Sequence, residues 1–162
     1  MHTVKSSTAR KTGIVAASSA LLLLVGAIIA MKMDGPPSRA DPDNLSQVSV
    51  GKHLYDAHCA SCHGTGLEGQ PDWRKKLPNG RMPAPPHDAT GHTWHHTDSM
   101  LFGITKYGLL PGKYAPPDYR SDMPAFIGTL SDEEIWAVLA YIKSFWPQEL
   151  RKAQRDLTLH RH

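Results

Sequence analysis

The feature that most constrains this chain is the pentapeptide Cys59-Ala60-Ser61-Cys62-His63, which contains both cysteines of its 162 residues. Two thiols three residues apart lie on one turn of a helix, so both can form thioethers with the two vinyl groups of a single porphyrin. The histidine that follows can then take one axial position on the iron. The motif therefore predicts one covalently bound haem c, attached through Cys59 and Cys62 and ligated by His63.

Three other uses of paired cysteines fit the sequence less well. A thioredoxin-like redox pair belongs to a βαβ pattern and is not followed directly by a histidine ligand. A structural zinc site requires four ligands, and the chain has no second cysteine pair. A disulfide between Cys59 and Cys62 would close a tight, strained loop. The haem interpretation is therefore preferred.

A long uncharged stretch precedes the motif. Residues 12–31 contain no Lys, Arg, Asp or Glu and include the run Leu21-Leu22-Leu23-Leu24-Val25. As a helix, this stretch would span about 30 Å, which matches the hydrocarbon core of a bilayer. Basic residues before it favour a cytoplasmic N-terminus. The sequence predicts a cytoplasmic segment at residues 1–11 and one transmembrane signal-anchor helix at residues 12–31.

A cleaved signal peptide is the alternative for this stretch. The apolar region of a signal peptide normally runs about 7–15 residues, and the best cleavage candidate, Ile28-Ile29-Ala30, is poor at its first position. An uncleaved anchor that contacts the lipid bilayer through residues 12–31 is therefore preferred. Both alternatives export the haem domain, as haem c maturation requires in bacteria. We expect a single-pass protein of the bacterial inner membrane, with its haem domain on the periplasmic side.

The overall basic charge does not indicate a nucleic-acid partner. Of the 18 Lys and Arg, three (Lys5, Arg10 and Lys11) precede the anchor, which leaves 15 against 15 Asp and Glu in the rest of the chain. A nucleic-acid footprint requires a clustered basic excess. One local basic run, Trp73-Arg74-Lys75-Lys76, lies near the predicted haem edge, where it is either a docking patch for an acidic redox partner or an ordinary solvated surface. The solvated surface is the preferred interpretation.

Composition and periodicity divide the exported part into three segments. Residues 32–47 are rich in proline, glycine and acidic residues and predict a linker. Residues 48–146 predict the haem domain, and residues 147–162 a polar, basic tail that is either a solvated helix or disordered. A helix is expected from Ser46 or Ser49 through Cys59.

Two more helices are predicted downstream. Residues 97–108 have an apolar face and are capped by Thr97 or Asp98. The last helix begins after Ser131, which with Glu134 forms a capping box, and it ends near Trp146-Pro147. The fold class is therefore all-α.

Four histidines lie in a proline-rich stretch between the motif and these helices: His87, His92, His95 and His96. Imidazoles at this spacing could bind copper or zinc, or one could be a second haem ligand. The alternative is a loop that covers the haem pocket, with imidazoles bonded to propionates or backbone. The loop is preferred, because no carboxylate or thiolate set completes a recognisable metal site and long irregular loops are usually covers or binding segments.

The chain resembles the class I (mitochondrial-type) cytochromes c over residues 48 to 145. The resemblance rests on Gly51-x-x-x-Tyr55 before C-x-x-C-H, on Met123-Pro124, and on the capped aromatic last helix. It implies a class I cytochrome c fold, a small helical domain wrapped round one covalent haem, behind one N-terminal transmembrane helix. It also implies that Met123 is the second axial ligand and that Val138 and Tyr141 meet Gly51 and Tyr55.

Met82 and Met100 are rival ligands to Met123. Met82 is also followed by Pro-Ala but precedes the helix at 97–108, and Met100 lies within that helix. Both are interpreted as packing residues.

Filled axial positions predict electron transfer rather than catalysis, since the iron has no open site for a small-molecule substrate. We expect a membrane-tethered cytochrome, not an enzyme, that carries single electrons between membrane redox complexes acting as donor and acceptor. Two alternatives remain: a fixed haem subunit of a larger oxidase or dehydrogenase complex, and a haem or copper sensor that uses the histidine-rich loop. The proline-rich linker favours a mobile carrier.

Overall fold

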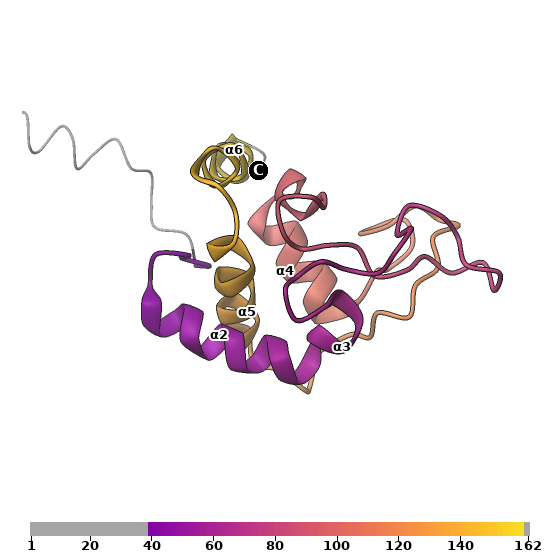
Figure 1. Ribbon diagram of the computed structural model, residues 1–162, viewed down its shortest axis with the longest axis horizontal. Coiled ribbons are helices and arrows are strands. Elements are labelled where there is room, and N and C mark those ends of the chain that lie inside the picture. The colour runs from indigo at the N-terminus through magenta and orange to yellow at the C-terminus, as the bar shows by residue number, and fades with distance from the viewer. Residues whose placement is uncertain (1–38, 161–162) are drawn as a thin grey trace, which may run out of the picture. The chain divides into compact units, whose positions relative to one another are not determined.

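A computed structural model describes residues 39–160 of the chain (Figure 1). The predicted cytoplasmic segment, the predicted anchor and residues 32–38 of the predicted linker lie outside the described residues. Among the helices between residues 39 and 160, none is long and apolar enough to cross a membrane. The regular structure in this range consists of helices and three isolated β-bridges, which confirms the all-α prediction.

The core of the domain is the crossing of α2 (Leu45–His58) and α5 (Asp132–Ser144). Figure 1 shows the two helices crossing at a steep angle. Gly51 lies at the contact, where a Cβ atom would collide with the carbonyl oxygen of Ala137 and lie 2.9 Å from Cβ of Tyr141. The fully buried ring of Tyr55 lies 5.3 Å from the ring of Tyr141. Gly51 and Tyr55 thus face α5 as expected, with Ala137 rather than Val138 against the glycine.

Both helices begin where the sequence supplies a side-chain cap. The Asn44 side chain accepts a hydrogen bond from the backbone of Gln47, which starts α2 slightly before the predicted position. The Ser131–Glu134 capping box is present at the start of α5, where it satisfies backbone N–H groups that have no partner within the helix. Caps of this kind fix the residue at which each helix begins.

Helix α4 (Asp98–Tyr107) packs against α5 and has the predicted Thr97 cap, whose hydroxyl accepts from Met100 N. The Phe102 ring stacks on Trp136 of α5 at 4.4 Å between centroids. At the other end of α4, the carbonyls of Thr105 and Lys106 accept hydrogen bonds from the backbone of Phe126 and Ile127. These bonds tie the segment after Met123 to α4.

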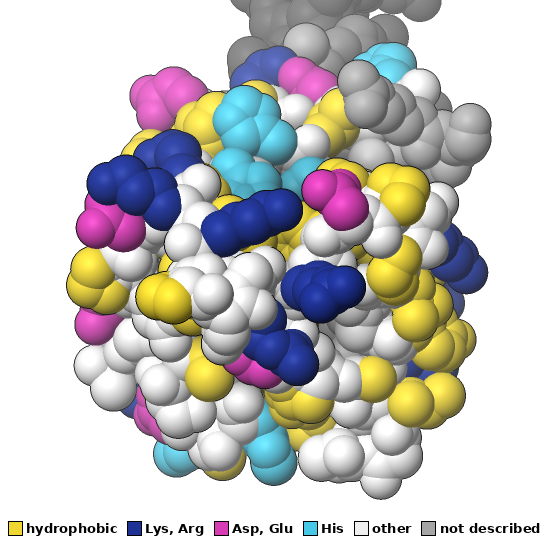
Figure 2. Space-filling view, turned by 90° about the vertical axis from the view of Figure 1, so that its right-hand side faces the viewer, with side chains coloured by type: hydrophobic (Ala, Val, Ile, Leu, Met, Phe, Trp, Pro, Cys, Tyr) yellow, Lys and Arg dark blue, Asp and Glu magenta, His cyan; other side chains and the backbone are white. Residues whose placement is uncertain are grey.

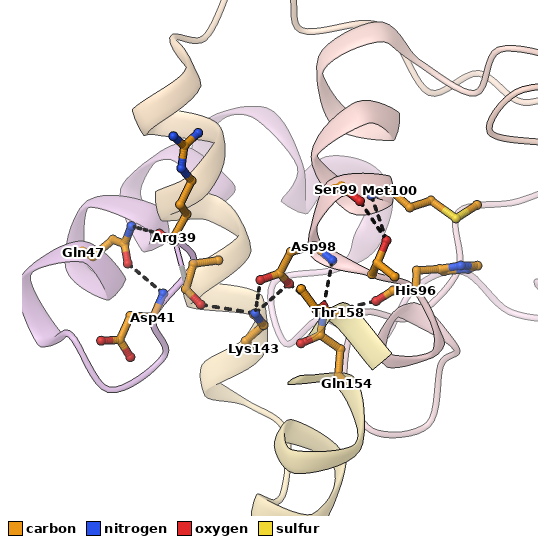
Figure 3. Close-up of polar contacts among 12 residues, drawn as sticks. Arg39, Asp41, Gln47, His96, Asp98, Ser99, Met100, Lys143, Gln154 and Thr158 are labelled. Atoms are coloured by element: carbon orange, nitrogen blue, oxygen red, sulfur yellow. Dashed lines mark hydrogen bonds and ion pairs between the residues drawn. The ribbon is translucent and has the colours of Figure 1, made fainter. Parts of the chain in front are cut away.

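The polar tail contains a further helix, α6 (Gln148–His160). One buried side chain of this helix attaches it to the rest of the domain. Gln154 is fully buried although it lies in a very polar segment. Its Nε2 donates to Asp98 Oδ1 at 2.6 Å and to the His96 carbonyl at 3.1 Å. Figure 3 shows that the same carboxylate receives Lys143 from α5.

This buried polar network joins four parts of the chain. Lys143 Nζ lies 2.8 and 3.0 Å from the two oxygens of Asp98, and it donates to the carbonyl of Ala40 at 3.3 Å. The Asp98 backbone N–H donates to Thr158 Oγ1 of α6 (Figure 3). Burial lowers the pKa of Lys143, and the neighbouring Asp98 opposes that change. The network therefore holds a charged pair inside the domain at the junction of α4, α5 and α6.

Replacing Gly51 with alanine should destabilise the domain. Alanine is the better helix former by about 0.5–1 kcal/mol, but its Cβ would collide with the Ala137 backbone, and overpacking of this kind costs about 1–3 kcal/mol. Ser49→Ala on the exposed side of α2 is the matched control and should be neutral or slightly stabilising. Denaturant unfolding followed by circular dichroism measures both, and equal stability of the two variants would refute the close contact.

Replacing Lys143 with methionine should cost about 3–5 kcal/mol, because it removes the cation from a buried carboxylate. Lys152→Met is the control, since its pair with Asp156 has side chains 76% and 49% exposed and exposed pairs contribute about 0–1 kcal/mol. The free energies of unfolding of the two variants, measured by denaturant titration, show how much the buried pair stabilises the domain. A loss for Lys143→Met no larger than that for Lys152→Met would show that the network contributes little.

Candidate haem-binding site

The two cysteines of the motif lie at a helix junction. Cys59 separates α2 from the single turn α3 (Ala60–His63), and its carbonyl accepts from Cys62 N at 3.1 Å and His63 N at 2.9 Å. The turn therefore carries both thiols and the histidine on adjoining positions. Both cysteines are free, Cys62 is exposed, and burial together with the neighbouring Cys62 raises the pKa of Cys59 to about 11.

The imidazole of His63 is buried and fixed by one hydrogen bond. Its Nδ1 lies 2.8 Å from the carbonyl oxygen of Pro85. Since a carbonyl can only accept, Nδ1 carries the proton and Nε2 keeps its lone pair. Burial lowers the pKa of His63, partly offset by the bond to Pro85, so the ring is neutral at neutral pH. A neutral imidazole with a free Nε2 is the form that binds iron.

Pro85 reaches His63 because the loop after the motif folds back closely on residues 84–88. Gly69, at φ 69°, allows this approach: a Cβ there would lie 2.6 Å from the Pro85 carbonyl carbon. Its N–H donates to the His63 carbonyl at 2.8 Å. Beside it, the fully buried Leu67 accepts at its carbonyl from His87 N at 2.8 Å. The glycine-rich loop (residues 64–69) and the proline-rich segment (residues 83–88) thus pack against each other around His63.

His87 lies directly against His63. The two imidazoles stack with centroids 3.9 Å apart and planes inclined by 20°. Nδ1 of His87 is 2.9 Å from Oγ1 of the buried Thr93, and the His87 carbonyl accepts from Trp146 Nε1 at 2.8 Å. Burial and the neighbouring histidines hold the pKa of His87 well below its usual range, so its ring is neutral.

The other three predicted histidines lie elsewhere. His92 stacks on Trp73 at 5.2 Å and meets His96 edge-on at 5.3 Å, whereas His95 is exposed and stacks on Trp94. Burial and the neighbouring histidines lower the pKa of both His92 and His96, and Arg74 contributes at His92. Within residues 39–160, no group of three or more His, Cys, Asp or Glu side chains could hold a metal ion. The loop therefore divides its imidazoles among three environments.

Met123 lies in the loop between α4 and α5, partly buried and packed against the core cluster. Its backbone N–H donates to Ser121 Oγ at 3.1 Å. The segment around Met82 runs beside this loop, since Met82 N donates to the Arg120 carbonyl and Met82 forms a bridge with Ser121. Arg81 Nη1 donates to the Ser121 carbonyl at 2.9 Å. Both methionine segments are thus held together by backbone contacts.

The residues present fit a covalent haem c. Two free thiols and a neutral imidazole with an available Nε2 lie on consecutive turns, and this donor set suits haem attachment and axial ligation. The sequence missed the residues that orient this set, namely Pro85, Thr93 and Trp146. A proline or threonine is recognisable by sequence, but a contact made by a backbone carbonyl across a loop leaves no local pattern. The one relevant pattern in the sequence is the set of prolines, which indicates that residues 83–86 are stiff.

The loops beside the site present a basic surface. They lie at the right of Figure 1, and Figure 2 looks onto that end, where several lysine and arginine side chains lie near the centre of the view and histidines at its upper and lower edges. Residues 70–82 and 109–122 contain six basic residues (Arg74, Lys75, Lys76, Arg81, Lys113 and Arg120) and three acidic ones (Asp72, Asp118 and Asp122). Exposed ion pairs join each acidic residue to one basic residue. The surface keeps a positive excess.

The segment that contains this site is similar to known proteins. Residues 48–146 match the family model described as Cytochrome c. The chain is 29% identical to cytochrome c-555 of Prosthecochloris aestuarii over 65% of this chain and 93% of that protein. It is 36% identical to the cytochrome bc1 complex cytochrome c subunit of Mycobacterium leprae over 41% of this chain but only 29% of that protein. It is 29% identical to cytochrome c6 of Tetradesmus obliquus over 60% of this chain and 89% of that protein. No solved structure matches the chain significantly.

Trp146→Phe tests how strongly the segment that carries His87 is held. The variant loses the bond from Nε1 to the His87 carbonyl, and we expect a loss of about 1–3 kcal/mol for the unpaired acceptor. In the control Trp94→Phe, the buried Nε1 has no partner among the described residues, so no hydrogen bond is lost. Thermal unfolding of both haem-loaded proteins measures the difference. If Trp94→Phe is destabilised as much as Trp146→Phe, the hydrogen bond is not what holds the segment.

Proposed function

The chain belongs to the cytochrome c family, and we propose that it carries single electrons between membrane redox complexes while tethered to the bilayer by residues 12–31. Electron transfer through covalently bound haem c is the activity of the family. The observation that carries the proposal is the neutral, oriented imidazole of His63 beside two free cysteines. The all-α class I fold around this site agrees with it.

The residues of the site have distinct roles in this proposal. Cys59 and Cys62 attach the porphyrin, and His63 binds one axial position of the iron. Met123 binds the other, and its soft, neutral thioether favours the reduced state more than a second imidazole would. The bound haem supplies a one-electron couple. The chain keeps the two ligands in fixed positions, so little rearrangement accompanies each transfer.

Fixed positions follow from contacts of the loop that carries Met123. Arg81 and the Met82 segment bind it on one side, and the bonds from Phe126 and Ile127 to the end of α4 hold it on the other. A ligand loop held on both sides keeps its sulfur near one place in both oxidation states. Of the two neighbouring methionines, Met123 is preferred because it follows α4, whereas Met82 precedes that helix, and because these contacts flank Met123 on both sides.

The location and partners are also part of the proposal. An anchor at residues 12–31 would place the haem domain on the periplasmic face of a bacterial inner membrane. A tether raises the concentration of the domain near membrane oxidoreductases. The positive excess on the loop surface favours partners with acidic docking sites.

A fixed subunit of a respiratory complex is the second candidate. Two of the relatives, those of Mycobacterium leprae and Corynebacterium efficiens, are named cytochrome bc1 complex cytochrome c subunit. The chain spans only 29% and 39% of those two proteins, however, while it spans 93% of cytochrome c-555. This coverage and the proline-rich linker favour a separate carrier. The sensor alternative gains no support from the loop, whose imidazoles are dispersed.

Ferric absorption spectra of the haem-loaded protein test the proposed ligation, with Met123→Ala compared against Met82→Ala. Methionine ligation gives a weak charge-transfer band at the red end of the visible spectrum. We expect this band in the wild type, its loss in Met123→Ala together with a lower reduction potential, and its retention in Met82→Ala. The two methionines lie in adjoining segments, so Met82→Ala controls for a general loosening of the loop.

Two results would contradict this ligation. A wild type without the band would exclude methionine as the second ligand, and the histidine loop would then supply the first candidates. Loss of the band in Met82→Ala with retention in Met123→Ala would exchange the roles of the two methionines.

A further inference from the structure

In the proposed ligation the imidazole of His87 neither attaches the haem nor binds its iron, yet it stacks on His63. We propose that His87 is a positioning residue that fixes the ring plane of His63. The proposal rests on His63 being an axial ligand, as argued above. The proposed contact of His87 is with the face of the His63 ring, not with either of its nitrogens.

The hydrogen bond to Pro85 alone does not fix this plane. It holds Nδ1 of His63 near the Pro85 carbonyl, and the helix backbone holds Cβ. A single hydrogen bond tolerates a range of angles, so the ring can still rotate over a limited range about its Cβ–Cγ bond. A second aromatic ring, 3.9 Å away and inclined by only 20°, opposes that rotation on one face. Together the two contacts restrict the orientation of the ring more than either does alone.

His87 can act as a stop because the chain holds it at three points. Its backbone N–H donates to Leu67, and its carbonyl accepts from Trp146. Its Nδ1 is bonded to Thr93 Oγ1. That hydroxyl donates to the Pro86 carbonyl at 3.4 Å, so its oxygen accepts a hydrogen bond from the His87 Nδ1–H group. Three separate segments therefore determine where the His87 ring lies.

Ordinary core packing is the alternative explanation, and the chemistry of the pair argues against it. An apolar residue at position 87 would fill space against His63 without a polar partner. The chain instead buries an imidazole and a threonine hydroxyl that satisfy each other. Burying polar groups costs free energy unless they are paired, and even then the net gain is small. A matched polar pair at this position specifies the orientation of a ring rather than stability.

The orientation has a spectroscopic consequence. In a low-spin ferric haem, the plane of the axial imidazole relative to the porphyrin nitrogens contributes to the rhombic splitting of the iron d orbitals. The g values in electron paramagnetic resonance report that splitting. They change when the ring plane rotates, and their lines broaden when it is distributed over several orientations.

Electron paramagnetic resonance of the full-length, haem-loaded ferric protein at low temperature tests the proposal. We expect His87→Leu to shift and broaden the g values relative to the wild type, because leucine offers no flat face. His87→Phe restores a flat ring without the bond to Thr93, and it should shift them less than leucine does. The control His95→Leu removes an exposed imidazole from the same loop and should leave the spectrum unchanged.

Thr93→Val keeps the test decisive if His87→Leu does not fold. Valine removes the hydroxyl that holds Nδ1 and retains the His87 ring, so we expect broader lines with little shift of their positions. Wild-type g values and linewidths in both His87→Leu and Thr93→Val, or in Thr93→Val if it alone folds, would overturn the proposal. Larger changes for His95→Leu than for His87→Leu would overturn it as well.

Failure of this inference can be told from failure of the proposed ligation. A wild-type protein without a low-spin ferric signal would refute axial ligation by His63 and Met123, and the positioning role with it. A low-spin wild type that is insensitive to His87 refutes only the positioning role.

Discussion

The hydrogen bond between His63 Nδ1 and the Pro85 carbonyl is the contact on which the site depends. It selects the tautomer that leaves Nε2 available, and it joins the haem-attachment turn to a segment 22 residues further along the chain. The glycine-rich loop has to fold closely over residues 84–88 to make this bond possible, which explains the positive φ and tight contact of Gly69. The orientation of the His63 ring thus depends on two loops, while its position depends on the helical turn α3.

Helix packing and loop placement are separable parts of this fold. The contact of Gly51 with α5 and the Tyr55–Tyr141 pair build the crossing on which the motif sits, and they consist of close backbone approach and aromatic packing. The loops depend instead on polar contacts from the end of the chain, through Trp146 and Gln154. A mutation in the first set changes stability throughout the domain, whereas one in the second changes the surroundings of His63 most directly.

The sequence predicted the parts of the structure that depend on local patterns. The helix before the motif, the Thr97 cap and the Ser131–Glu134 capping box are confirmed because caps and periodicity act over a few residues. The tail was predicted only as a solvated helix or disorder, because the buried partner of Gln154 is an aspartate 56 residues away. His87 was identified as one of four similar histidines, and nothing in the spacing distinguished the one that reaches His63. Long-range polar contacts in loops depend on the path of the whole chain.

The tail also changes how the haem domain is bounded. The family match ends at residue 146, yet α6 follows directly and donates, through Gln154, to the His96 carbonyl. Trp146 holds the His87 carbonyl, so the segment from Trp146 to Gln154 binds both ends of the histidine-rich loop. Asp98 is bonded to Gln154 and paired with Lys143, which couples this clamp to the core helix α5. Helix α6 therefore belongs to the haem domain in its physical contacts, although it lies beyond residue 146, where the family match ends.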